Sequence, residues 1–449
     1  MTGLPDGPLN CLRILWRMAF SRRGAALVIV AALTVVVGGA PAAAAAGSAF
    51  SVIGTPSLGA DNTNNLVSIA DISPAEAWAV GNTSRNGPTA PLVEEWQAGR
   101  WHVMNNIPVP IAGQAAQFTG VVAPSPTSVW AVGYAQNQEG STQPLVEHWD
   151  GSGWGIVTTE ATSTQSSNTL NAIGADTPGD VWAVGTFQNP NGTQQTLVER
   201  WQGSGWNIIQ SPDPNPQANA EFTTVAPLTP TDVWAAGYSV DQNSGNEVPL
   251  TEMWNGTAWS IVPFPVPTLP GDATITSLAV ENATDIWAVG NATTGQATAS
   301  FIAHFNGTAW SLLPTPVDGL EQQSQLNDIA ITSATTVIAV GSLGNQPLIE
   351  QWNGSSFSVA TAPSAGDTGQ YVFEAAAASS ASDIWVVGNG LNSLGNEQPV
   401  VAHAGPLPSP PPGTTSCSAY EGGKWQSTLA GAAPGRVRWW LLCISEIHG

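Results

Sequence analysis

The body of this chain lacks cysteine. The three cysteines, Cys11, Cys417 and Cys443, all lie near the ends of the sequence. A fold built from the central residues therefore cannot depend on disulfides, and it cannot offer a thiol nucleophile or a Cys-based metal site. The sequence leaves open whether Cys417 and Cys443 pair after export.

Positive charge is also scarce in the body. Residues 47–405 contain three basic residues, Arg85, Arg100 and Arg200, against 29 acidic ones. A chain this acidic repels phosphate backbones, which argues against nucleic acid as a partner. The acidity suits the solubility of an exported protein, and attraction of cations or basic partners is the alternative interpretation.

Signatures of catalysis and of cofactor binding are missing as well. The sequence contains no His-x-x-x-His metal spacing, no Gly-x-Ser-x-Gly elbow, no phosphate-binding loop and no EF-type calcium loop. His148, His304 and His403 share one repeat position, so they fall in different repeats and cannot gather. We therefore predict no catalytic residue, no metal site and no cofactor.

The N-terminus contains an export segment. Arginines from Arg13 to Arg23 precede an apolar run from Ala25 to Val37, and small residues with Ala-x-Ala sites follow. This order predicts a secretory signal peptide over residues 1–46. An uncleaved membrane anchor is the alternative, and both place the body outside the cytoplasm. We therefore predict a secreted, extracellular or cell-surface protein that has no other contact with a membrane.

Seven repeats of about 50 residues fill residues 47–405. The phrase Trp-Ala-Val-Gly recurs with small changes, in steps of 52, 52, 52, 53, 51 and 47 residues. Its first positions are Trp78, Trp130, Trp182, Trp234, Trp287, Ile338 and Trp385. An apolar residue lies 12 positions before each of them, and a phrase related to Leu-Val-Glu-x-Trp follows. Such periodicity is typical of repeat architectures.

Each repeat is predicted to form four short strands, called a to d in chain order. The strands are four to six residues long and rich in β-branched and aromatic residues, and Asn-Gly or Asp-Gly often joins strands c and d. Four antiparallel strands in about 50 residues predict one propeller blade. The predicted fold class is therefore all-β, a seven-bladed β-propeller of four-stranded blades.

The seventh repeat lacks a strand d, and the N-terminal segment offers a replacement. Residues 49–57 (AFSVIGTPS) match residues 356–364 (SFSVATAPS), which contain strand d of the sixth repeat. We therefore predict that residues 49–57 complete the last blade and close the ring, so that no long strand edge stays exposed. The following residues, 406–449, are predicted to form a Pro-rich linker and an irregular tail.

Most recurring residues are expected to be structural. The repeated Trp bury large apolar faces between blades. A glutamate on strand c and an aspartate just before strand b each recur in several blades, which indicates a requirement of the fold. The glutamates are Glu94, Glu147, Glu199, Glu252 and Glu350. The aspartates, each expected to form an Asx-type turn, are Asp180, Asp232, Asp285 and Asp383.

A ligand site is predicted on the face with the variable loops. In a four-stranded blade the b–c and d–a loops emerge on the same face, and here they vary more than the other connections. Equivalent residues of different blades converge only on strand a, at the axis. Polar residues stand there where packing would favour apolar ones, and the candidate ligand-binding residues are Asn171, Thr223, Asn327, Asp328 and Glu374. The alternative is the lining of a water-filled channel.

The phrases Asp-Val-Trp-Ala-Val-Gly and Glu-x-Trp-Asn-Gly-x-x-Trp resemble those of secreted bacterial propeller repeat proteins, which are broadly similar to propellers of the kelch and galactose-oxidase type. The resemblance covers residues 49–404 and implies an architecture only. The chain lacks the Gly-Gly doublet of kelch repeats. The copper-radical oxidases of that class use a Cys–Tyr pair, which a body without cysteine cannot form.

Three functions are compatible with these observations. The first is a monomeric, extracellular and non-enzymatic binding or scaffolding module that recognises a glycan or a protein on the loop-rich face. The alternative is a carbohydrate-active hydrolase or lyase with carboxylates at the channel mouth, where Asp328 and Glu374 would supply the pair that glycoside hydrolysis needs. The third is purely structural display at the cell surface. The sequence leaves the ligand and any bound cation open.

Overall fold

The structure is a computed structural model, which describes residues 49–407 apart from 57, 161–165, 213, 268–270, 296, 320–321, 334 and 366–368, together with 415–420 and 424–429. The predicted signal peptide, residues 1–46, and Cys443 lie outside the described residues. Within the described part, the regular elements are all strands. None of the described residues forms a helix that is long and apolar enough to span a bilayer.

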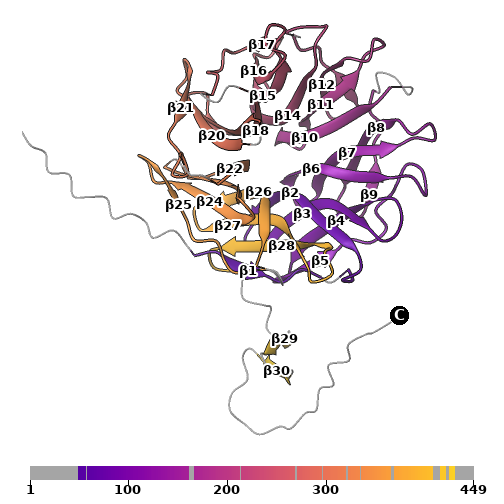
Figure 1. Cartoon of the computed structure of the whole chain (residues 1–449). Helices are drawn as coiled ribbons and strands as arrows, with labels where there is room; N and C mark the ends of the chain where they lie inside the picture. Colours follow the sequence, from indigo (N-terminus) through magenta and orange to yellow (C-terminus); the bar gives the residue numbers. More distant parts are fainter. Residues whose placement is uncertain are drawn as a thin grey trace, which may run out of the picture. The chain divides into compact units, whose positions relative to one another are not determined.

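Seven four-stranded antiparallel sheets are arranged around a common axis as the blades of a propeller (Figure 1). This confirms the predicted all-β, seven-bladed fold. The first strand of each blade lies innermost and contacts the first strand of the next blade. These inner strands, strand a of blades 1 to 7, are β2 (Thr63–Ser73), β6 (Ala116–Ser125), β10 (Asn168–Thr177), β14 (Ala220–Thr229), β18 (Asp272–Asn282), β22 (Ser324–Ser333) and β26 (Tyr371–Ser380).

The other strands follow outward in chain order. Strand b is β3 (Glu76–Ser84), β7 (Ser128–Gln136), β11 (Asp180–Gln188), β15 (Asp232–Val240), β19 (Asp285–Thr294), β23 (Thr336–Leu343) and β27 (Asp383–Leu391). Strand c is β4 (Ala90–Gln97), β8 (Thr142–Trp149), β12 (Gln194–Trp201), β16 (Glu247–Trp254), β20 (Ala297–Phe305), β24 (Gln346–Trp352) and β28 (Glu397–Ala404). Strand d is β5 (Arg100–Val103), β9 (Trp154–Ile156), β13 (Trp206–Ile208), β17 (Trp259–Ile261), β21 (Trp310–Leu313), β25 (Phe357–Val359) and β1 (Ser51–Ile53).

Strands a to c are longer than the predicted four to six residues. The ladder continues past each repeated phrase into polar residues, as where Gln188 pairs with Gln194. Within the tail, β29 (Thr415–Tyr420) and β30 (Lys424–Leu429) pair as an antiparallel hairpin. Alternation of hydrophobic residues marks only the half-buried centre of a strand, so its polar ends escape sequence prediction.

The N-terminal segment closes the seventh blade, as predicted. β1 pairs antiparallel with β28, and Ser51 lies opposite His403. The matching pair in the continuous fourth blade is Ser260 opposite Met253, so the supplied strand has the register of an ordinary strand d. The Ser51 hydroxyl also donates to the His403 carbonyl oxygen at 3.3 Å, across 352 positions of sequence. The ring is therefore sealed by the two ends of the body.

Tryptophan forms the contacts between blades. The Trp of strand b packs against two aromatic rings of a neighbouring blade, one from strand c and one from strand d, with centroids 4.9 to 5.9 Å apart. The interface between blades 6 and 7 differs, since Ile338 and Ala404 stand where other blades have aromatic residues. The repeated Trp therefore hold the scaffold together, as their recurrence indicated.

The glycine of the Trp-Ala-Val-Gly phrase is required by a bulge in strand a. In blade 3 the register shifts between Leu170 and Ala172, which leaves Asn171 as an extra residue on the strand. Beside this bulge, a Cβ on Gly185 would overlap the carbonyl oxygen of Thr169. The same shift recurs in all seven blades, so every repeat has a glycine at this point.

Candidate functional site

The residues predicted to bind a ligand lie half-buried on the inner strands, where their polar groups join neighbouring blades. Asn171 donates to the carbonyl oxygen of Phe222 at 2.9 Å, and Thr223 donates to that of Ile275 at 2.6 Å. Asn327 makes the equivalent bond to blade 7 at 2.8 Å. Each is the extra residue of its bulge. We call these bonds between blades the bulge belt.

Asp328 and Glu374 also contact neighbouring blades, but no hydrogen bond joins them to each other in the described part of the chain. The Asp328 carboxylate accepts hydrogen bonds from the Ser277 hydroxyl of blade 5 and the Ala376 amide of blade 7. Burial raises the pKa of Asp328 to about 6, although these donors oppose the rise. Glu374 accepts a bond from Asn327 at 3.2 Å. These contacts give both carboxyl groups a role within the scaffold.

The hydrogen bonds of the bulge belt predict that Thr223→Val lowers the free energy of unfolding. Valine keeps the shape of threonine but leaves the Ile275 carbonyl oxygen without its donor, so we expect a loss of about 1–2 kcal/mol in the free energy of unfolding. Chemical denaturation measures it, with Thr308→Val on an exposed hairpin as the matched control. An unchanged stability for Thr223→Val would instead favour a hydroxyl kept for a ligand.

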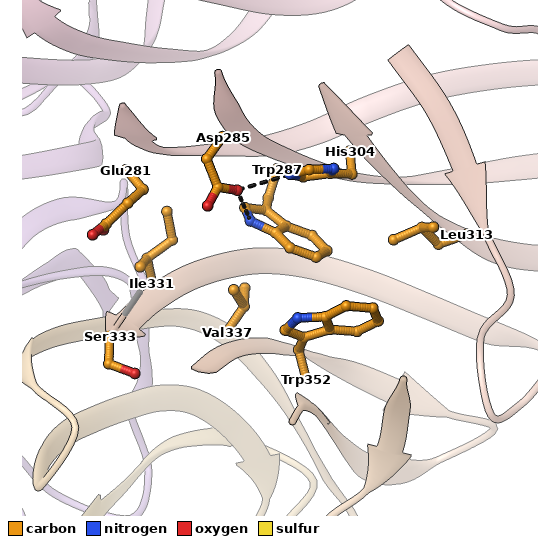
Figure 2. A pocket seen from close by; sticks show the side chains of 9 residues that line it. All are labelled: Glu281, Asp285, Trp287, His304, Leu313, Ile331, Ser333, Val337 and Trp352. Atoms are coloured by element: carbon orange, nitrogen blue, oxygen red, sulfur yellow. Dashed lines mark hydrogen bonds and ion pairs between the residues drawn. The ribbon is translucent and has the colours of Figure 1, made fainter. Parts of the chain in front are cut away.

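A cavity of about 210 Å³ lies between blades 5 and 6 (Figure 2). Its wall includes the carboxylates of Glu281 and Asp285, which lie beside the turn from β18 to β19. The cavity therefore lies on the side of the ring opposite the b–c and d–a loops. The lining residues that matter here are Glu281, Asp285, Trp287 and His304 from blade 5, and Val337 and Trp352 from blade 6. Figure 2 shows the two groups facing each other across the cavity.

Asp285 organises the polar wall of this cavity. Its Oδ1 accepts a hydrogen bond from Nε1 of Trp287 at 2.8 Å and lies 2.8 Å from Nε2 of His304. The His304 ring packs against Trp287 in a tilted arrangement, with centroids 4.5 Å apart and an angle of 44° between the rings. The pair stays open to solvent, since 30% of the Asp285 side chain and 26% of the His304 side chain are exposed. The Oδ2 atom of Asp285 accepts no hydrogen bond from any described residue.

In blades 3 and 7 the side chains at the same repeat positions are more deeply buried than in blade 5. In blade 7, His403 and Asp383 are 2.7 Å apart but only 0% and 1% exposed. In blade 3, Arg200 binds both oxygens of Asp180 at 2.6 and 2.7 Å, and its guanidinium lies 4.5 Å from the ring centroid of Trp182. This position therefore brings a cationic or ionisable group against an aspartate and an indole ring in several blades.

Glu281 sets blade 5 apart. It lies six positions before Trp287, where the other blades have Ile72, Pro124, Asp176, Leu228, Thr332 and Ser379. Asp176 is the only other acidic residue in that set; burial and the neighbouring Asp180 raise its pKa, and the charge of Arg200 partly offsets this rise. The cavity of blade 5 thus has two carboxylates and an imidazole on its wall but no fixed positive charge.

Sequence reasoning missed this cavity. Asp285 was expected to form an Asx-type turn, and that is wrong, because its carboxylate binds Trp287 and His304. The turn is made by Asn282, which accepts a hydrogen bond from the Thr284 amide at 3.0 Å. The signal that could have found the site is the comparison of repeats at the position of Glu281, where this blade alone adds an acid without a nearby arginine.

A second cavity, of about 190 Å³, lies at the closure of the ring. Val52 and Ile53 of β1 line it together with Leu391 at the end of β27 and Val400 of β28, so its wall is largely apolar. It lies where the b–c loop of blade 7 leaves the sheet, on the loop-rich side. Among the described residues, no three His, Cys, Asp or Glu side chains are grouped to hold a metal ion.

Four glutamates of strand c form a further set of titratable groups. They are fully buried, and their carboxyl oxygens have no hydrogen-bond partner among the described residues: Glu94, Glu147, Glu199 and Glu350. Each shares the face of strand c whose Leu and Trp pack against the preceding blade. Burial raises the pKa of each carboxyl to about 8. Their recurrence indicates a part in the scaffold, as predicted.

Comparison with known proteins shows the fold. No protein-family model matches the chain, and no curated protein does. An ulvan lyase, a polysaccharide lyase, is similar over 77% of this chain and 94% of its own, with 12% identity and a TM-score of 0.50. A protein of unknown function from Dyadobacter fermentans is similar over 79% and 97%, with 12% identity and a TM-score of 0.47. Sqt1 from Chaetomium thermophilum, bound to the N-terminus of ribosomal protein L10, is similar over 76% and 97%, with 10% identity and a TM-score of 0.43.

Proposed function

We propose that this protein is an extracellular, non-enzymatic binding module that recognises a glycan through the b–c loops of its propeller. The observation that supports this most is the shared, hydrogen-bonded conformation of three of these loops. A loop that is ordered before binding loses little conformational entropy when a ligand arrives. Variable loops on a rigid scaffold are also the usual place for a binding site.

The loop of blade 3 illustrates the conformation. The Asn189 amide donates to the Thr193 carbonyl at 2.9 Å, and the Asn189 side chain accepts from the Thr193 amide at 3.0 Å. Gly192 completes the turn with a φ of 90°, which favours glycine. The loops of blades 2 and 7 are closed in the same way from Asn137 and Asn392. The loop of blade 4 is one residue longer: the Asp241 amide donates to the Asn246 carbonyl oxygen, and the Asp241 side chain accepts from the Ser244 amide.

The tips of these loops present amide and hydroxyl groups to solvent. The exposed side chains include Gln138, Asn191, Asn243, Ser244 and Ser393. Such groups both donate and accept hydrogen bonds, which matches the hydroxyl groups of a sugar. The acidic body opposes a polyanionic glycan, so the proposed ligand is neutral or carries amino groups.

The hydrolase or lyase alternative has less support. It needs Asp328 and Glu374 to act as a pair on a sugar, but the Asp328 carboxylate already accepts two backbone amides and a hydroxyl. Glu374 is bound to Asn327 of the neighbouring blade. To act on a substrate, both carboxylates would have to give up their hydrogen bonds to neighbouring blades, and this would destabilise the ring.

A glycan array with the full chain tests the proposal. The protein has one lysine, Lys424, which lies outside the propeller sequence, so amine coupling through it leaves the loop side chains unmodified. We expect the variant Gln138→Ala/Asn191→Ala/Asn243→Ala to bind its glycan at least about tenfold more weakly, since several hydrogen bonds of about 1 kcal/mol are lost. Its unfolding temperature should change little, because the three side chains are exposed, although Asn191 accepts one bond within its loop, from the Thr193 amide at 3.0 Å.

Glu281→Gln, on the other side of the ring, is the matched control and should bind the glycan normally. If the triple variant still binds the glycan with unchanged affinity, the binding site does not lie on these loops. Absence of binding to every glycan on the array would contradict a glycan as the ligand class. Release of a cleaved sugar that Glu374→Gln abolishes would establish the hydrolase or lyase alternative instead.

A further inference from the structure

The cavity between blades 5 and 6 has unused hydrogen-bond acceptors. Oδ1 of Asp285 is held by Trp287 and His304, whereas its Oδ2 and the exposed Glu281 carboxylate accept nothing from the described residues. The cavity wall contains no lysine or arginine. The site therefore offers negative charge and lacks a fixed partner for it.

Aromatic surface completes the cavity. The half-buried Trp352 of blade 6 faces Trp287 of blade 5, with ring centroids 5.2 Å apart (Figure 2). An indole face attracts a cation that lies within about 6 Å of its centroid. Carboxylates beside indole rings are thus a combination that selects positively charged groups over neutral ones.

Blade 3 provides an internal precedent. There the chain places its own cation at the corresponding position, because Arg200 pairs with Asp180 and lies over Trp182. In blade 5 the shorter His304 occupies the position of Arg200, and the space beside it is the cavity. The volume of about 210 Å³ exceeds that of one water, about 30 Å³, and admits a short alkyl chain with its charged head.

We propose that this cavity binds an organic cation, an alkylguanidinium or alkylammonium group, which Glu281 and Asp285 hold by charge-assisted hydrogen bonds against Trp352. A guanidinium group should bind more tightly, because its planar fork matches a carboxylate and stacks on an indole face. The acidic body raises the local concentration of any cation near the cavity. This site lies on the side opposite the proposed glycan surface and does not depend on it.

Ligand-observed NMR and calorimetry on the full chain test the proposal, with n-butylguanidinium, n-butylammonium and neutral n-butanol as probes. We expect both cations to bind and butanol not to bind. Glu281→Gln should weaken the cations at least about fivefold, and Glu281→Lys, which places a tethered ammonium at the cavity, should abolish binding. Glu281 is exposed, so neither change threatens the fold. Glu139→Gln on a b–c loop is the control of equal charge and should have no effect.

The source of the cation is decided by comparing the free probes with the tripeptides Ala-Arg-Ala and Ala-Lys-Ala, capped at both ends. Equal affinity indicates a small free cation, and markedly tighter peptide binding indicates a basic side chain of a partner protein. The proposal would be overturned if butanol bound with the same affinity as the cations. It would also be overturned if Glu281→Gln left the affinity for the cations unchanged. The loop variant Gln138→Ala/Asn191→Ala/Asn243→Ala should bind the cations normally, so the two proposed sites can fail separately.

Discussion

A variant with Glu94, Glu147, Glu199 and Glu350 all replaced by glutamine should lose most of the pH dependence of its stability. Burial raises the pKa of each carboxyl from 4.5 to about 8, so the folded protein keeps these groups neutral at pH 7. In the unfolded chain they ionise above their ordinary pKa. Unfolding therefore releases protons between these two values, and the stabilisation is complete below pH 4.5 and lost as the pH rises through 8.

The expected effect is large because each pKa unit corresponds to about 1.4 kcal/mol and four groups act in the same direction. The unfolding temperature of the wild-type protein should fall by at least about 10 °C between pH 5 and pH 9. Calorimetry over this range should show less than half of that fall for the glutamine variant. At pH 9 the variant should be the more stable protein.

Part of the slope will remain in the variant. Burial and the neighbouring Asp383 raise the pKa of Asp71 to about 7, and burial raises that of Asp328 to about 6. Both groups weaken the fold as the pH rises, by the same linkage. Glu139→Gln, which changes an exposed glutamate, should leave the wild-type slope intact. A quadruple variant with the full wild-type slope would show that the buried glutamates are already ionised in the folded protein.

Deletion of residues 49–56 should destabilise the whole ring. It removes Phe50 and Ile53 from two interfaces between blades, and burial of such a side chain contributes about 1.5–3 kcal/mol. It also leaves the outer edge of β28 unpaired, which favours association between chains. We expect a loss of at least about 5 kcal/mol in unfolding free energy and soluble aggregates on size-exclusion chromatography.

A circular permutant distinguishes loss of the strand from loss of the N-terminus. Ala404 is joined to Phe50 through Asn-Gly-Thr-Ala, the residues found at 255–258 in the fourth blade, and the chain then runs from Leu58 to Pro56. Because β1 has the register of an ordinary strand d, the permutant should fold and unfold within a few degrees of wild type. A stable deletion variant, or a permutant that fails to fold, would contradict the role assigned to β1.

The fold could be derived from the sequence because its signal is repeated seven times. Errors at one repeat are corrected by the others, as where Ile338 replaces the usual Trp but keeps its spacing. The closure was readable for the same reason, since the residues around Phe50 copy those around Phe357. The extent of each strand was not readable, because polar residues at strand ends pair through their backbone alone.

The candidate sites could be read only in part. Asn171 and Thr223 were identifiable as unusual polar residues, but the bulge that leaves each outside the ladder is a feature of register, which no single repeat reveals. The cavity beside Glu281 depends on side chains from two blades whose contact is not local in sequence. The repeat pattern shows which positions are equivalent, and the candidate site lies where one repeat has a different residue at such a position, as Glu281 does.

The seal between β1 and β28 has a consequence for biosynthesis. A ribosome adds about 5–20 residues per second, so His403 leaves it roughly 20–70 s after Ser51, its partner 352 positions earlier. Until then the ring stays open, because β1 has no partner strand and the seventh blade is incomplete. The nascent chain therefore cannot complete its native ring until β28 has been synthesised, and this delay gives chaperones time to act on it.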